Sequence, residues 1–71
     1  MQTITLQRSG GYLFAEFSDG KQIVSPDKQL KNFAKTVALH VAPLQKAVLD
    51  FDNGAIEVMG IAVAREIRNR I

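Results

Sequence analysis

The chain has 71 residues, of which 46% are hydrophobic and 23% are charged, and it contains no cysteine. This length allows a single domain, residues 1–71, with a small core, and the lack of cysteine excludes disulfides and thiolate zinc sites. Nine Lys and Arg residues against seven Asp and Glu residues give a formal net charge of +2, which is a weak signal for nucleic acid.

The chain shows no sign of membrane insertion or export. No apolar stretch approaches the roughly 20 residues needed to span a bilayer, and Met1–Arg8 lacks the basic start and apolar run of a signal peptide. We therefore expect a cytoplasmic protein that is not embedded in a membrane.

The first strand is predicted at Gln2–Arg8, where threonine and glutamine alternate with Ile4 and Leu6. A two-residue loop at Gly10–Gly11 starts a second strand, with Leu6 expected opposite Leu13 and Ile4 opposite Ala15. The inner face would then hold Ile4, Leu6, Leu13, Ala15 and Phe17. A three-residue loop would exchange the inner and outer sets.

A third strand is predicted after Asp19–Gly20, a dipeptide that favours two-residue hairpin turns. This turn is expected to place Val24 opposite Ala15 and Ile23 opposite Glu16. The face away from the inner set would then carry Tyr12, Phe14 and Ile23.

One long amphipathic helix is predicted after this strand. Ser25 is expected to cap its first amides, Pro26 suits the first helical position, and the residue before Pro43 is disfavoured in a helix. Apolar residues recur at helical spacing at Leu30, Phe33, Ala34, Val37 and Val41. This stripe is long enough to cover the inner face of a small sheet.

Residues 44–59 fit either a hairpin or helices, because Leu44, Val48 and Phe51 also have helical spacing. As a hairpin turning at Asn53–Gly54, they would pair Phe51 with Ile56, Leu49 with Val58 and, unfavourably, Asp50 with Glu57. The turn signal favours the hairpin.

A short helix is predicted at the end of the chain, with Val63, Ile67 and Ile71 on one side. The predicted fold is therefore α+β, with a small antiparallel sheet of two hairpins in the order β-β-β-α-β-β-α. One long amphipathic helix and the short C-terminal helix would cover this sheet.

Catalytic and metal-binding constellations are scarce. His40 is the only histidine, and we interpret it as a polar residue near a helix C-terminus. Asp50, Asp52 and Glu57 could in principle pair for acid-base chemistry or hold a divalent cation, but such residues around one hairpin are usually solvated. We expect no enzyme, no metal and no cofactor.

Two surfaces are candidates for binding. The outer set Tyr12, Phe14 and Ile23 must be covered either by the C-terminal helix or by a partner, and both alternatives stay open. The basic residues are the candidates for a nucleic-acid contact, although helical Lys and Arg are more often a solvated face: Lys28, Lys31, Lys35, Arg65, Arg68 and Arg70.

Four segments, in order, carry a resemblance to a known family: Tyr12–Lys21, Leu30–Thr36, Pro43–Ala47 and Gly54–Val58. They are similar to the small bacterial domain of unknown function 2442, with its strand ending in a Ser-Asp-Gly-Arg-like turn, a helix and a Gly-x-x-Ile-x-Trp strand. This sequence departs from it at Val58–Gly60, where the family has Trp and then an acidic segment.

The resemblance implies a β-rich domain with covering helices and no catalytic residues, found alone or beside a helix-turn-helix domain. Members are often encoded next to a small partner in toxin–antitoxin-like pairs. Our leading hypothesis is a non-enzymatic, bacterial or phage protein-binding module, antitoxin-like or an inhibitor, acting in a homodimer or a heterocomplex. The alternative is a nucleic-acid-binding module that uses the basic helix faces.

Overall fold

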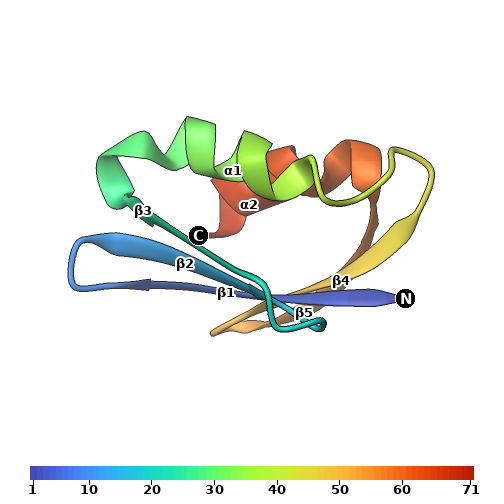
Figure 1. Ribbon diagram of the computed structural model, residues 1–71, viewed down its shortest axis with the longest axis horizontal. Coiled ribbons are helices and arrows are strands. Elements are labelled where there is room, and N and C mark those ends of the chain that lie inside the picture. Colours follow the sequence, from blue (N-terminus) through green and yellow to red (C-terminus); the bar gives the residue numbers. More distant parts are fainter.

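A five-stranded sheet carries both helices on one of its faces (Figure 1). The computed structural model describes residues 1–71. The strands are β1 (Gln2–Ser9), β2 (Tyr12–Phe17), β3 (Gln22–Pro26), β4 (Lys46–Phe51) and β5 (Gly54–Met59). The helices are α1 (Leu30–Ala38), entered through the 3₁₀ turn η1 (Asp27–Gln29), and α2 (Val63–Arg70), entered through the 3₁₀ turn η2 (Gly60–Ala62).

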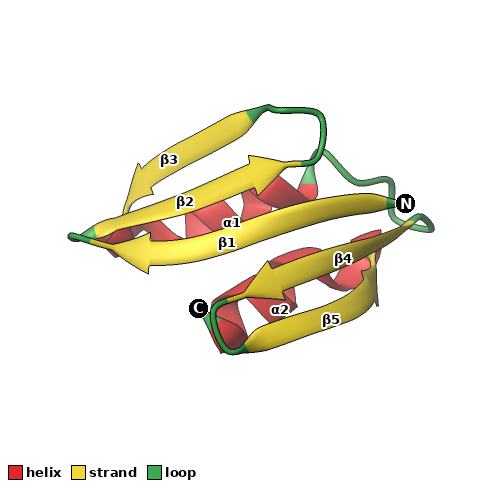
Figure 2. Cartoon of the chain, turned by 90° about the horizontal axis from the view of Figure 1, so that it is seen from below, coloured by secondary structure: helices red, strands yellow, loops and turns green.

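The sheet is mixed rather than purely antiparallel. Its strand order is β3-β2-β1-β4-β5, and β1 runs parallel to β4 from the pair Gln2–Ala47 to the pair Thr5–Asp50. The arrows of β1 and β4 point the same way in Figure 2. The prediction of a purely antiparallel sheet is therefore wrong. The chain returns through α1 across one face of the sheet, so β4 lies beside β1 and runs in the same direction.

The turn between β1 and β2 is the predicted two-residue loop. Gly10 and Gly11 have φ of 60° and 83°, and a side chain would be strained in both conformations. Ile4 lies opposite Phe17 and Leu6 opposite Ala15. The predicted pairs are therefore shifted by two residues. The predicted inner set is still correct, because side chains alternate with a period of two and a shift of two residues leaves each one on the same face.

The turn between β2 and β3 has three residues, Ser18 to Gly20, instead of two. The Gly20 N–H donates to the Phe17 carbonyl at 2.9 Å and the Phe17 N–H donates to the Lys21 carbonyl at 2.8 Å. Gly20 takes a φ of 95°, as the left-handed residue of such a loop requires. The extra residue moves β3 by one position relative to the prediction.

That one-residue difference reverses the faces of β3. Ile23 lies opposite Ala15 and packs against the core, and Val24 lies opposite Phe14 and is exposed. The prediction that Ile23 joins Tyr12 and Phe14 on the outer face is wrong for this physical reason.

Residues 46–59 form a hairpin, so the helical alternative is wrong. Its loop is Asp52–Asn53, with Phe51 paired to Gly54 and Leu49 to Ile56, two residues away from the predicted pairs. Asp50 consequently lies opposite Ala55, and the unfavourable pair of carboxylates does not form. The Lys46 ammonium instead lies 3.7 Å from a Glu57 oxygen.

The amphipathic helix is shorter than predicted and starts differently. It consists of the three-residue turn η1 and the nine-residue α1. Ser25 lies in β3, and no side chain caps either segment, so the predicted serine cap is wrong. The Asp27 N–H donates to the Gly11 carbonyl at 2.9 Å, which ties the helix start to the first turn.

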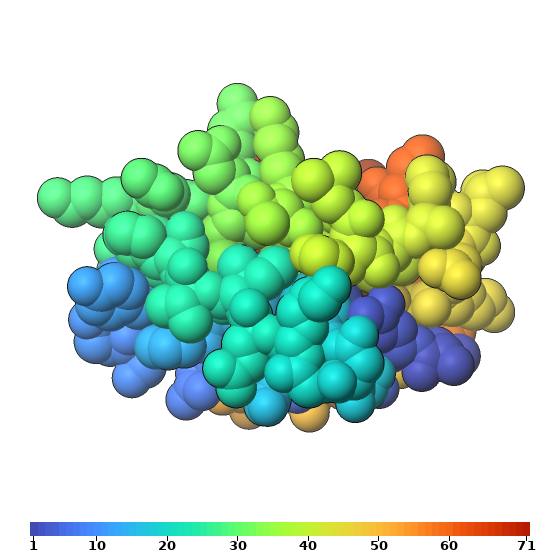
Figure 3. Space-filling view, viewed as in Figure 1, coloured from blue at the N-terminus to red at the C-terminus, as the bar shows by residue number.

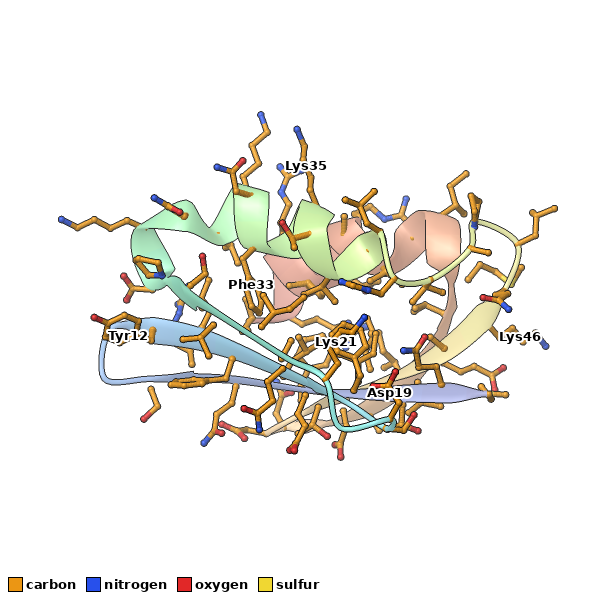
Figure 4. The ribbon with its side chains drawn as sticks, in the orientation of Figure 1. Tyr12, Asp19, Lys21, Phe33, Lys35 and Lys46 are labelled. Atoms are coloured by element: carbon orange, nitrogen blue, oxygen red, sulfur yellow. The ribbon has the colours of Figure 1, made fainter.

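The core lies between the sheet and the helical layer. Phe33 points from α1 toward the sheet (Figure 4) and is 1% exposed. Fourteen buried hydrophobic residues form one cluster, and no buried polar residue interrupts it. Its members are Ile4, Leu6, Leu13, Ala15, Phe17, Phe33, Ala34, Val37, Val41, Ala47, Leu49, Phe51, Val63 and Ile67.

Gly60 joins the last strand to the helical layer at a point of very close approach. Its N–H donates to the Gln45 carbonyl at 2.7 Å, and a Cβ added there would meet the Ala42 carbonyl oxygen at 1.9 Å. Only glycine allows η2 to pack directly on the backbone that precedes β4.

We predict that Phe33→Ala lowers the free energy of unfolding by about 3–5 kcal/mol, because it leaves a cavity in the only core. Thermal and urea unfolding would measure the loss. Leu39→Ala is the matched control in the same segment, since Leu39 is 84% exposed, and its cost should stay within about 0.5 kcal/mol. Equal costs for both variants would contradict this account of the core.

Gly60→Ala should cost about 1–3 kcal/mol or more, because the backbone at Ala42 must move to admit the methyl group. Ile61→Ala, at the exposed neighbouring position, should change stability little. Urea unfolding of both variants checks the difference, and an unchanged midpoint for Gly60→Ala would show that the close contact is not required.

Candidate functional site

The face of the sheet opposite the helices is uncovered. Figure 2 shows this face with both helices behind the strands, and α2 packs against α1 rather than on this side. The alternative that the C-terminal helix covers the outer face is therefore wrong. Val63 and Ile67 of α2 instead belong to the core that α1 shares.

The β2–β3 half of this open face carries exposed apolar side chains. Phe14 and Val24 are directly opposite each other, and Tyr12 is opposite Pro26. Tyr12, Phe14 and Val24 are 50%, 37% and 54% exposed. We refer to Tyr12, Phe14, Val24 and Pro26 as the open-face cluster.

A hollow of about 300 Å³ opens beside Phe14 on this face. Its lining also contains Val24, Glu16 and Gln22, and the Gln22 amide lies 3.4 Å from a Glu16 oxygen as a hydrogen-bond donor. Polar residues thus border the apolar cluster on the sheet, with Thr5 and Gln7 of β1 on the other side of the hollow.

Two of the three predicted contact residues lie in this cluster. Tyr12 and Phe14 are on the open face, and Ile23 is on the helix side. Sequence reasoning missed Val24 and Pro26. The signal for them was the Ser18–Gly20 segment, which fits a three-residue loop with glycine last.

The six basic residues predicted on helices all lie in the helical layer. Lys28 belongs to η1, Lys31 and Lys35 belong to α1, and the three arginines belong to α2. Because α1 and α2 pack side by side on one face of the sheet, the structure unites two sets that the sequence keeps 30 residues apart. Lys35 points away from the sheet in Figure 4.

Glu66 is the acidic partner of two of these residues. Its carboxylate lies 2.9 Å from Arg70 Nε and 3.8 Å from Arg65 Nε. Lys28, Lys31, Lys35 and Arg68 form no ion pair.

A second exposed apolar group lies at one end of the helical layer. Leu39 follows α1, Leu44 lies in the connection to β4, and Ile61 lies in η2, with exposures of 84%, 83% and 77%. The Ile61 N–H donates to the Pro43 carbonyl at 3.0 Å, so η2 and this connection are adjacent. The group is wholly aliphatic and lines no hollow.

A smaller hollow of about 210 Å³ lies where the C-terminal ends of β1 and β4 separate. Arg8, Asn53 and Arg70 contribute polar groups to its lining. Arg70 already pairs with Glu66, and no buried polar atom lacks a partner.

The remaining sequence candidates are dispersed. His40 follows α1 and packs edge-on against Phe17, with ring centroids 4.9 Å apart. Asp50 and Glu57 lie on different strands without facing each other, and Asp52 is in the turn. No three potential metal ligands lie together, and no helix has the length and apolar character to cross a membrane.

Comparison with known proteins gave no match: no family model, no curated protein and no solved structure is similar to this chain. The resemblance to the domain of unknown function 2442 stays a prediction. The site is therefore defined by the chain's own geometry.

The faces of β3 can be tested by comparing neighbouring substitutions. Ile23→Thr should lower the free energy of unfolding by about 1–2 kcal/mol, because a side chain packed on the core loses apolar burial. Val24→Thr should have little effect, since threonine suits an exposed strand position. Urea unfolding measures the free energy of unfolding of both variants. A larger loss of stability for Val24→Thr than for Ile23→Thr would contradict the three-residue turn and favour the predicted two-residue turn.

Proposed function

We propose that this protein is a non-enzymatic protein-binding module whose partner docks on the open sheet face. The observation that carries the proposal is the open-face cluster, two aromatic side chains with Val24 and Pro26 on a face that no helix covers. Exposed apolar groups bordered by polar residues are typical of protein interfaces.

The shape of the face favours a protein over a small molecule. Small-molecule sites are usually concave and enclose most of their ligand. The hollow beside Phe14 lies on the surface of a sheet, and its lining comes from three adjacent strands. Such a surface can take one anchoring side chain of a partner, while the surrounding cluster provides flat contact area.

The open-face cluster is a better candidate than the group at Leu39, Leu44 and Ile61. Residues that dominate binding energy are enriched in tyrosine, tryptophan and arginine and lie in well-packed pockets, whereas leucine is under-represented. Phe14 lines a hollow and has Tyr12 two residues away on the same strand face, whereas Leu39, Leu44 and Ile61 line no hollow.

The charge of the open face supports a narrower class of partner. Glu16, Asp50 and Glu57 lie on this side of their strands, and Lys46 is the basic residue beside them. A partner with an apolar anchor flanked by Lys or Arg would complement both the cluster and the carboxylates. Within this class we propose a regulatory role, antitoxin-like or inhibitory. The family resemblance supports the antitoxin-like role, because members are often encoded next to a small partner in toxin–antitoxin-like pairs.

Phe14→Glu should abolish partner binding while the protein stays folded, because the added charge would be desolvated only in the complex. Site-specific photo-crosslinking in the native host measures this, with p-benzoylphenylalanine replacing Tyr12 or Val24. We expect one discrete adduct from both positions, absent when Phe14→Glu is added. Sedimentation velocity of the purified protein distinguishes a second copy of the chain from another protein.

Thr36, exposed on α1, is the control position for the probe, and Leu39→Glu is the control substitution. The probe at position 36 should give no adduct, and Leu39→Glu should leave the adducts at positions 12 and 24 unchanged. The same adduct from position 36, or an adduct that survives Phe14→Glu, would refute docking on the open face. Circular dichroism confirms that each variant is folded.

A further inference from the structure

The charges of this protein are divided between its two layers. Residues 27–38 and 60–70, which form the helical layer, contain six basic and two acidic side chains, a net charge of +4. The rest of the chain contains three basic and five acidic side chains, a net charge of −2. The helical layer is therefore strongly basic although the overall net charge is only +2.

The basic side chains form two adjacent rows. Lys31 and Lys35 are one helical turn apart, about 6 Å along α1, and Arg65 and Arg68 are about 4.5 Å apart along α2. The helices are antiparallel in Figure 1 and packed together, which places their axes about 8–10 Å apart. In Figure 3 the side chains of the α1 segment project outward from the helix side.

Four of the six cations take part in no ion pair. Lys28, Lys31, Lys35 and Arg68 form no ion pair, and Glu66 is shared by Arg65 and Arg70. Long cationic side chains without partners can reach separate anionic groups across a surface.

We propose that the helical layer is a second binding surface, for the phosphate backbone of duplex nucleic acid. The two rows stand on adjacent helices whose axes lie about 8–10 Å apart, a spacing on the scale of the duplex grooves, which are about 6 and 12 Å wide. Long Lys and Arg side chains on both helices can therefore reach phosphates on both strands. Lys and Arg contacts to phosphate position a protein without reading sequence. The binding is therefore independent of sequence.

The distribution of aromatic residues selects duplex over single strands. Proteins that bind single strands stack the bases on exposed aromatic side chains. Here Phe17, Phe33 and Phe51 are buried, and Tyr12 and Phe14 lie on the opposite face of the molecule. The helical layer offers charge without a stacking platform.

The test measures the binding of a fluorescein-labelled DNA duplex of about 20 mixed-sequence base pairs by anisotropy, across a salt series. We expect micromolar affinity at about 50 mM salt and roughly a 100-fold loss at about 200 mM, the change expected for about four phosphate contacts. The single strand of the same sequence should bind at least about tenfold more weakly.

The triple variant Lys28→Gln/Lys31→Gln/Lys35→Gln should weaken duplex binding at least about tenfold. It should also reduce the slope of log affinity against log salt concentration by the amount that corresponds to about three phosphate contacts. The control Arg8→Gln/Lys21→Gln/Lys46→Gln removes the same number of charges from outside the helical layer, and it should change affinity less than about threefold. All six residues are exposed, and circular dichroism verifies the folding of both variants.

Equal losses in the two triple variants would overturn the proposal, because net charge alone would then explain the binding. A preference for the single strand, or no duplex binding at low salt, would also overturn it. Binding to phosphatidylserine-containing vesicles without binding to the duplex would assign the surface to membranes instead. Phe14→Ser should retain the affinity for the duplex. The proposal for this surface and the proposal for the protein-docking face can therefore be tested independently.

Discussion

The parallel contact between β1 and β4 is the constraint on which the rest of the structure depends. Each hairpin has one apolar face but no means of burying it alone, and α1 is the segment that joins them. By crossing the helix side, α1 places β4 against β1, from Gln2–Ala47 to Thr5–Asp50, and makes one continuous apolar floor. Both helices then pack on that floor.

Covering one face has consequences for the other. The helices supply Phe33, Val37, Val63 and Ile67 to a single core, and no segment of residues 1–71 lies over Tyr12, Phe14 and Val24. The open face is thus a direct result of placing both helices on the same side, and the proposed protein contact rests on it.

The same arrangement separates the charges. An amphipathic helix on a sheet must direct its polar residues outward, and in this chain those residues are mostly Lys and Arg. The strands carry most of the carboxylates in their solvent-facing positions and turns. Two chemically different surfaces therefore face opposite directions, one basic and the other apolar with an acidic border.

The sequence by itself predicted the order of the strands and helices, with residues 44–59 open between a hairpin and helices, and it predicted which residues of β1, β2, β4 and β5 face the core. Alternation and helical spacing are local properties, so they can be read without the tertiary structure. Errors of two residues at the first and last hairpins left those faces unchanged, since side chains alternate with a period of two. At the Ser18–Gly20 turn an error of one residue exchanged the predicted faces of Ile23 and Val24. Only the tertiary structure decided that β4 runs parallel to β1, that α2 lies beside α1, and that the basic residues of both helices share a surface. These features depend on how distant segments pack, about which local patterns carry no information.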